Sequence, residues 1–260
     1  MLKQLARRSA YQVVDIATMR RGIARTINGD AIRLAPEVAR YYPSSYEPTT
    51  QAFLRRHTAP GTLAVDAGAH IGLFTVQMAR DVGPQGRVLS FEPTATTARL
   101  LRRTVELNAL GDVVDCRQEA LSGARGFLEF FVDEHEASNA NSLVRTAGAV
   151  GSVRVPTVSI DDLAAAETRR MSCVKIDVEG AELDVLRGAA ATLADDRPAL
   201  ALDIHPAQLA AGGGSVAEVW DVLADAGYVA LLGDARLDRA ETVARTEIFE
   251  LHAVPAAETA

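Results

Sequence analysis

Acidic side chains follow four apolar runs in this sequence, and a histidine accompanies the last of them. The residues are Asp66, Glu92, Asp177 with Glu179, and Asp203 with His205. Carboxylates accept hydrogen bonds from hydroxyl and amino groups, and a histidine can take a proton from a reacting hydroxyl near neutral pH. If the runs are parallel strands, their carboxyl ends meet at one sheet edge, where ligands bind in open α/β sheets. The pattern therefore indicates a ligand site rich in hydrogen-bond acceptors beside one candidate base.

A glycine turn follows the first of these runs. Gly68 and Gly72 come directly after the apolar residues around Asp66, and apolar side chains then recur at helical spacing over 73–80. This order predicts a buried strand, a tight turn and a helix start. Glycine lets the backbone approach a ligand closely because it carries no Cβ, and a helix start offers unpaired N–H groups. The negative charge of Asp66 disfavours a phosphate-binding turn and suits a ligand with an amino group.

A second predicted strand, 87–92, ends in Glu92, twenty residues after Gly72. This is the spacing of one strand–helix–strand unit, which brings an acid beside a bound ribose at the carboxyl edge of the sheet. Each carboxylate oxygen can accept one ribose hydroxyl. A third strand is predicted at 113–118, so Gln118 or Glu119 is expected either near an adenine ring or in solvent.

Four blocks of sequence together resemble the FkbM group of S-adenosylmethionine-dependent methyltransferases. They are residues 65–72 (VDAGAHIG), 91–93 (FEP), 175–182 (KIDVEGAE) and the closing Asp203-x-His205. The blocks occur in the family's order, and the resemblance covers about residues 46–253. This chain has His70 where the family usually has asparagine, and Asp203 where it usually has glutamate. The second difference shortens a carboxylate side chain by one carbon.

The resemblance implies an α/β fold of the class I methyltransferase (Rossmann-like) type. Its doubly wound, seven-stranded, mostly parallel sheet has helices on both faces and an antiparallel last strand. The methyltransferase domain is expected at 46–254, after a helical N-terminal extension at 1–45 and before a C-terminal tail at 255–260. Helices are predicted at 51–56, 95–108, 160–166, 181–193 and 216–226, and later strands at 199–204, 228–232 and 246–253.

The resemblance also implies roles for individual residues. The methionine part of S-adenosylmethionine is expected at the glycine turn, with Asp66 contacting its amino group directly or through water and Glu92 holding its ribose. The full set of expected cofactor contacts is Glu47, Asp66, Gly68, His70, Gly72, Glu92, Gln118, Glu119 and Asp177. The expected reaction is O-methylation of a hydroxyl on a sugar or a secondary-metabolite small molecule. His205 is the expected base, Asp203 orients it or binds substrate, and Asp177 lines the pocket.

A metal ion is the alternative means of activating that hydroxyl. Asp177, Glu179, Asp203 and His205 form a mostly oxygen-donor set, which suits Mg²⁺ or a similar hard ion. The competing interpretation is that these acids bind substrate hydroxyls and helix-start N–H groups.

The composition narrows the class of protein. The chain has 260 residues and a net charge of −7, which disfavours nucleic acid as a general partner. Cys116 and Cys173 show no C-x-x-C spacing, so reduced thiols and a cytoplasmic location are expected. No stretch approaches 18 consecutive apolar residues, so no membrane span is expected.

Residues 1–27 are basic and amphipathic and lack a secretory signal's apolar core. They are expected to form a helix that packs on the domain, joins a homodimer or touches an anionic membrane surface.

Two functions of other classes remain open. A NAD-dependent oxidoreductase would also use Glu92 for a ribose, but G-x-G-x-x-G is absent and Asp66 lies at the turn. A catalytically silent cofactor-binding or interaction protein is the second, and the acids and histidine at the strand ends argue against it. Residues 127–156 and the N-terminal segment are expected to shape the acceptor pocket.

Overall fold

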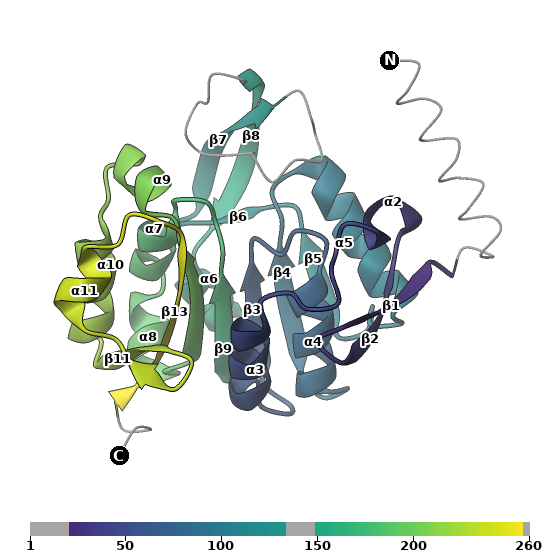
Figure 1. The fold of residues 1–260 in the computed structure, drawn as a ribbon, viewed down its shortest axis with the longest axis horizontal. Coiled ribbons are helices and arrows are strands. Elements are labelled where there is room, and N and C mark those ends of the chain that lie inside the picture. Colours follow the sequence, from purple (N-terminus) through teal and green to yellow (C-terminus); the bar gives the residue numbers. More distant parts are fainter. Residues whose placement is uncertain (1–20, 134–148, 257–260) are drawn as a thin grey trace.

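A central eight-stranded sheet organises the molecule (Figure 1). The computed structural model describes residues 21–133 and 149–256. The strand order is β12-β11-β13-β10-β9-β3-β4-β5. The strands are β3 Leu63–Ala67, β4 Arg87–Phe91, β5 Val114–Arg117, β9 Met171–Ile176, β10 Ala199–Ile204, β11 Tyr228–Leu232, β12 Ala235–Arg236 and β13 Phe249–Pro255.

The chain direction follows the class I methyltransferase pattern. β10, β9, β3, β4 and β5 run parallel, and β13 lies antiparallel between β10 and β11. The predicted count of seven strands is one too low, because the two-residue strand β12 pairs with β11 at the edge of the sheet. The last strand also continues to Pro255, one residue beyond the predicted domain end.

Helices cover both faces of the sheet (Figure 1), which is why β3 is buried along its whole length. One core cluster joins Ala64 of β3 to the helices α3 Pro48–His57, α4 Leu73–Val82 and α5 Ala95–Leu107. A second cluster joins alternate strand residues to the helices of the other face. Those helices are α6 Ile160–Ala166, α7 Glu182–Arg187, α8 Ala190–Asp195, α9 Pro206–Ala211 and α10 Val216–Asp225. A short helix, α11 Arg239–Val243, precedes β13.

The helix predicted at 181–193 is two helices, α7 and α8. The break follows from a tertiary contact, because the carboxylate of Asp161 accepts the N–H groups of Ala191 at 3.0 Å and Thr192 at 2.8 Å. These N–H groups lie in the first turn of α8, where no carbonyl of the same helix can accept them. The helix α6 begins where the sequence predicts, with reciprocal capping between Ser159 and Asp162.

The prediction of a helical N-terminal extension is wrong for residues 23–34. They form a hairpin of β1 Ile23–Ile27 and β2 Asp30–Leu34, followed by the short helix α2 Pro36–Ala39. The two-residue turn Asn28-Gly29 has positive φ angles of 48° and 88°, as hairpin turns of this length require. The apolar side of the hairpin packs with Ile71, Val76 and Leu100. The part of the predicted extension before residue 21 lies outside the described residues.

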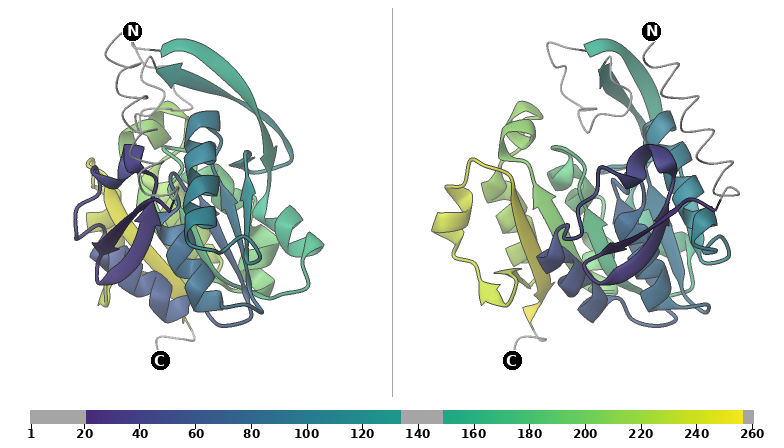
Figure 2. Two further views of the ribbon diagram at one scale, coloured as in Figure 1. Left: turned by 90° about the vertical axis from the view of Figure 1, so that its right-hand side faces the viewer. Right: turned by 45° about the vertical axis from the view of Figure 1, so that its right-hand side comes forward.

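A second, three-stranded sheet rises above the carboxyl edge of the main sheet (Figures 1 and 2). It contains β6 Ala120–Leu121, β8 Ala149–Val158 and β7 Gly126–Asp133 in that order. The strands β7 and β8 form a ribbon that contains the described part of residues 127–156, the segment expected to shape the acceptor pocket. Among the described helices, none has the length and hydropathy that crossing a bilayer requires.

Candidate active site

A cavity opens at the carboxyl ends of β3, β4 and β9. Its polar wall includes His70, Glu92, Thr97, Glu119, Asp177 and Glu179. Phe91, Leu121, Val178 and Leu128, the last from the ribbon strand β7, supply apolar surface. The ends of the parallel strands therefore meet at a concave site, as expected for an open α/β sheet.

Glu92 is the best-defined polar group on the cavity wall. It is 7% exposed, and its Oε2 accepts the N–H of His70 at 3.1 Å while its Oε1 accepts the N–H of Thr94 at 2.9 Å. Burial raises the pKa of Glu92 to about 7, although these N–H donors favour the ionised form. The hydroxyl of Thr94 also donates a hydrogen bond to this carboxylate, so a ribose at Glu92 would use the remaining lone pair and displace that hydroxyl. The ribose contact stays a prediction.

A glycine is required at position 68 because the backbone after β3 lies very close to the backbone after β9. The φ of Gly68 is +75°, and a Cβ at this position would lie 1.8 Å from the carbonyl oxygen of Asp177. The same strand ends are joined by a hydrogen bond of 3.0 Å from the Asp177 N–H to the Ala67 oxygen. The turn after β3 is thus held against the segment that carries Asp177.

Four of the predicted cofactor contacts, Glu47, Asp66, Gly72 and Gln118, do not line the cavity. Asp66 is 1% exposed beneath the turn, where it accepts the hydroxyl of Thr75 at 2.5 Å, and burial raises its pKa. Gly72, with a φ of +89°, faces Leu101 of α5. Gln118 is exposed and lies outside the lining, whereas its neighbour Glu119 belongs to it. The cofactor contacts predicted for these residues therefore stay predictions, and the Oδ1 atom of Asp66 is buried without a hydrogen-bond partner among the described residues.

The segment before α3 lies beside the cavity and presents a tyrosine to it. Tyr46 lines the cavity, while the neighbouring Glu47 is half-buried at the start of α3. Asn28 in the hairpin turn holds this segment, because its Oδ1 accepts the Tyr46 N–H at 2.9 Å. His70 is fixed from the same side by a hydrogen bond of 2.8 Å between its Nδ1 and the hydroxyl of Tyr42. The hairpin thus supports one wall of the site.

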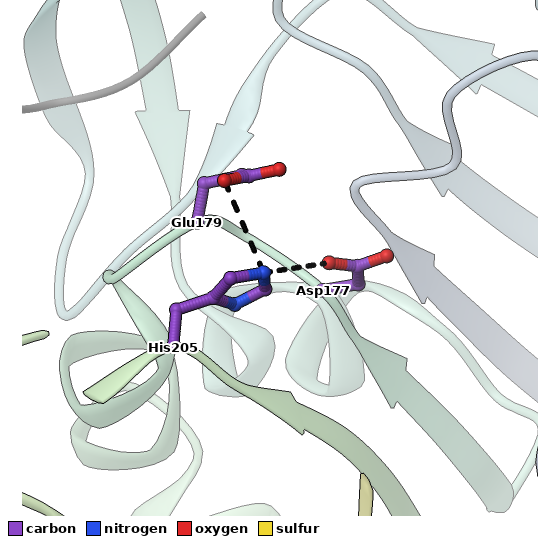
Figure 3. A group of neighbouring side chains, drawn as sticks. All are labelled: Asp177, Glu179 and His205. Carbon is purple, nitrogen blue, oxygen red and sulfur yellow. Dashed lines mark ion pairs between the residues drawn. The ribbon is translucent and has the colours of Figure 1, made fainter. Parts of the chain in front are cut away.

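A charged cluster lies directly after the ends of β9 and β10, beside the cavity (Figure 3). Its members are Asp177, Glu179 and His205, and Figure 3 shows the Nε2 atom of His205 between the two carboxylates. Nε2 lies 3.9 Å from Asp177 Oδ1 and 3.9 Å from Glu179 Oε2. The sequence prediction that Asp177, Glu179 and His205 lie together is confirmed.

Lys175 is a buried cation that the strand pattern did not assign to the site. Its Nζ lies 3.0 Å from Asp177 Oδ2 and 3.9 Å from Asp203 Oδ2, over the ring of Phe74. Burial alone would lower the pKa of Lys175, but the carboxylates of Asp177, Asp203 and Asp66 raise it instead. Burial also raises the pKa of Asp203 to about 7. Asp203 therefore faces Lys175, and its predicted contact with His205 is not made through its carboxylate.

Glu182 is the second residue that the strand pattern did not assign to the site. It is fully buried, and its Oε1 lies 2.9 Å from Nδ1 of His205. Burial alone would lower the pKa of His205, but the hydrogen bond and charge of Glu182, together with Glu179 and Asp177, raise it to about 9. No spacing rule reveals this contact, because it joins α7 to the end of β10.

The cluster fits a magnesium ion poorly. Ligand atoms of Asp177, Glu179 and His205 lie within 4.8 Å of one another, but Asp203 is not part of that group. Mg²⁺ prefers an octahedron of oxygen ligands, and this group offers two carboxylates and an imidazole. The carboxylate of Asp177 is also already neutralised by Lys175 at 3.0 Å. A divalent ion would have to displace or repel that buried ammonium group.

Comparisons with known proteins identify the family. The family model described as "Methyltransferase FkbM domain" matches residues 66–230. Methyltransferase 1 of Beauveria bassiana is 30% identical over 142 residues, which are 48% of this chain and 57% of that protein. Methyltransferase sdnD of Sordaria araneosa is 32% identical over 154 residues, which are 48% of this chain and 59% of that protein. The matches thus span less than two thirds of the length of these relatives.

Two further similarities are more distant. The AMB antimetabolite synthetase AmbE of Pseudomonas aeruginosa is 27% identical over 215 residues, 69% of this chain and 10% of that protein. A solved methyltransferase FkbM from Methylobacillus flagellatus aligns with 75% of this chain and 44% of its own, at 17% identity and a TM-score of 0.49. The family model covers well over half of the sequence, including the glycine turn, Glu92 and the cluster around His205. The chain therefore belongs to the FkbM family of methyltransferases.

Proposed function

We propose that this chain is an S-adenosylmethionine-dependent O-methyltransferase that acts on a hydroxyl of a sugar or a secondary-metabolite small molecule. The observation that carries the cofactor assignment is Glu92, a buried carboxylate that follows β4 and lines the cavity. A carboxylate has two oxygens, which can accept the two hydroxyls of a ribose. Membership of a methyltransferase family supports the same cofactor. When bound, S-adenosylmethionine supplies a methyl group on a positively charged sulfur.

The residues that would hold this cofactor line one cavity. Glu92 would accept the ribose hydroxyls, and Glu119 lies where the adenine is expected. Gly68 and His70 form the turn at which the methionine part is expected, and Asp177 lines the cavity beside that turn. Asp66 supports the turn from beneath, where its contact with Thr75 ties β3 to α4.

The assignment of a hydroxyl as the acceptor rests on His205. An alcohol is a poor nucleophile, so a positioned base assists the reaction. The Nε2 atom of His205 faces Asp177 and Glu179, both of which line the cavity. A positively charged ligand in the cavity lowers the pKa of His205 from its raised value, since like charges disfavour protonation. Lys175 holds Asp177 and Asp203 in place and balances part of their charge.

The name of the Pseudomonas aeruginosa relative, an antimetabolite synthetase, supports a small-molecule acceptor. Alignment of the acceptor oxygen with the methyl group supplies much of the rate in a displacement of this kind. The ribbon strand β7 contributes Leu128 to the cavity and is therefore expected to contact the acceptor or the adenine.

Calorimetry with S-adenosylmethionine and with NAD tests the cofactor assignment. We expect S-adenosylmethionine to bind and NAD not to bind. Glu92→Gln removes one charge from an acceptor pair, and hydrogen bonds to charged groups contribute about 1.5–3 kcal/mol each. The affinity should therefore fall by roughly 10–100-fold in this variant, while Gln118→Ala, an exposed change outside the cavity, should have no effect. Equal losses in the two variants would contradict the placement of the cofactor.

The oligomeric state, the cytoplasmic location and the absence of nucleic-acid binding stay predictions. The described part of the N-terminal segment packs on its own domain through Ile32 and Leu34. A homodimer would therefore have to form through other residues of that segment or through another surface. Size-exclusion chromatography with light scattering on the full chain, with and without residues 1–20, measures this.

A further inference from the structure

Glu182, the first residue of α7, is a carboxylate buried in the protein interior. It has no exposed surface. Its Oε1 accepts the N–H of Gly180 at 3.0 Å and lies 2.9 Å from Nδ1 of His205. Its Oε2 is buried and has no hydrogen-bond partner among the described residues. Burying an ionised group costs free energy unless a specific partner compensates it, so the contact with His205 calls for a functional explanation.

The two nitrogens of His205 have different surroundings. Nε2 lies 3.9 Å from each of the carboxylates of Asp177 and Glu179. These two charges would favour a proton on Nε2, and a neutral imidazole with its proton there has no lone pair to offer on that side. A base that acts on a hydroxyl in the cavity needs the opposite arrangement, with the proton on Nδ1.

Glu182 favours a proton on Nδ1 because it is buried and lies close to that atom. Its oxygen is 1.0 Å closer to Nδ1 than either competing carboxylate is to Nε2, and interaction between charges increases as their separation falls. The surroundings of Glu182 exclude water, whereas Asp177 and Glu179 are partly exposed and more strongly screened. Without Glu182, the remaining acceptor at Nδ1 is the neutral backbone oxygen of Asp203 at 3.2 Å.

We propose that Glu182 is a positioning residue that holds a proton on Nδ1 of His205 and leaves Nε2 free to act as the base. This inference rests on the role proposed for His205. Glu182 does not contact the substrate. It also accepts the N–H of Gly180 within the β9–α7 turn and, through His205, joins this turn to the end of β10, so a test must separate positioning from structural support.

A double-mutant cycle separates these two roles. Glu182→Leu is measured alone and in a His205→Ala background, with turnover followed as S-adenosylhomocysteine formed. We expect Glu182→Leu alone to lower kcat by roughly tenfold or more, since a positioned base contributes about 10²–10⁴-fold. The dissociation constant for S-adenosylmethionine should change by less than about twofold. In the His205→Ala background, the same change should lower kcat by less than about twofold, because its effect passes through His205.

Two further variants guard against a simple loss of fold. Glu182→Gln keeps an oxygen for the Nδ1 proton and the Gly180 N–H, so its kcat should lie between those of the wild type and Glu182→Leu. Asp184→Leu changes an exposed acid on the same helix and should leave kcat unchanged. An equal loss from Glu182→Leu with and without His205 would overturn the proposal, as would a Glu182→Gln variant no better than Glu182→Leu.

A spectroscopic measurement tests the proton position without turnover. In the wild-type protein, the Nδ1–H of His205 should give a slowly exchanging NMR resonance, assigned by its loss in His205→Ala. We expect this resonance to disappear or to exchange much faster in Glu182→Leu, which has no acceptor, and to persist in Glu182→Gln, which keeps one. Its persistence in both variants would overturn the role of Glu182. If the wild type forms no S-adenosylhomocysteine with any acceptor, the proposed function fails, and this resonance still decides whether Glu182 holds the proton.

Discussion

Replacing Gly68 by alanine tests how the glycine turn and the Asp177 segment fit together. The φ of Gly68 is +75°, and a left-handed conformation costs a residue with a Cβ about 1–2 kcal/mol. The new Cβ would also lie 1.8 Å from the Asp177 oxygen, so the two segments must separate by more than 1 Å to reach 3.0 Å. Forcing an extra carbon into a packed site costs about 1–3 kcal/mol. The total expected loss in the free energy of unfolding is therefore roughly 2–5 kcal/mol.

Gly61→Ala is the matched control for this variant. Gly61 has the same φ of +75°, but an added Cβ there meets no atom within 4 Å. The left-handed backbone conformation should destabilise both variants, whereas the steric clash should destabilise only Gly68→Ala. Separation at Gly68 would also break the bond from Asp177 to Ala67 and displace Asp177 from Lys175. We therefore expect Gly68→Ala to lose affinity for S-adenosylmethionine and Gly61→Ala to keep it.

Urea unfolding followed by circular dichroism measures the stability of both variants, and calorimetry measures the affinity. Equal destabilisation of Gly61→Ala and Gly68→Ala, with equal affinity for S-adenosylmethionine, would refute the reasoning. It would mean that the turn can move away from Asp177 at no cost.

Three further outcomes are expected. Burial, with His57 nearby, lowers the pKa of the fully buried His252 to about 4. Because the folded-state pKa lies below the unfolded value near 6.5, stability is lost as the pH falls from 6.5 toward 4. The wild type should lose about 3 kcal/mol relative to His252→Leu over that range, and a pH-independent difference in urea unfolding would contradict this. Turnover should survive exhaustive EDTA treatment, and a loss restored only by Mg²⁺ would show that a metal acts at the cluster. Ribose hydroxyls stabilise the carboxylate of Glu92, whose pKa burial raises to about 7, so cofactor binding near pH 6.5 should release protons. Calorimetric enthalpies independent of the buffer would argue against that contact.

Local patterns predict much of this fold. The reciprocal cap at Ser159 and Asp162 gives the start of α6, and the apolar runs give β10 and β11 at their observed bounds. The break between α7 and α8 depends on Asp161, thirty residues away, and no local pattern contains it. The N-terminal hairpin does have a local signal, the Asn28-Gly29 turn, but the basic amphipathic pattern before it favours a helix.

The candidate site is likewise only partly predictable from the sequence. The topology of parallel strands explains why Glu92, Asp177, Glu179 and His205 meet at one edge. The sequence does not reveal how deeply a side chain is buried, and Asp66, a predicted cofactor contact, is only 1% exposed. The burial of Lys175 and Glu182 comes from packing between α4, α7 and the strand ends. Charged residues are usually exposed, so a sequence pattern alone does not mark them as interior.

The central claim is methyl transfer to a hydroxyl at this cavity. The direct measurement is S-adenosylhomocysteine formation by the full chain, with a panel of sugars, polyols and hydroxylated secondary metabolites as acceptors. We expect turnover with at least one hydroxylated acceptor, a methyl ether as the product, and a loss of about 10²–10⁴-fold in His205→Ala. Binding of S-adenosylmethionine without turnover on any acceptor would contradict the claim, as would a His205→Ala variant that turns over at the wild-type rate.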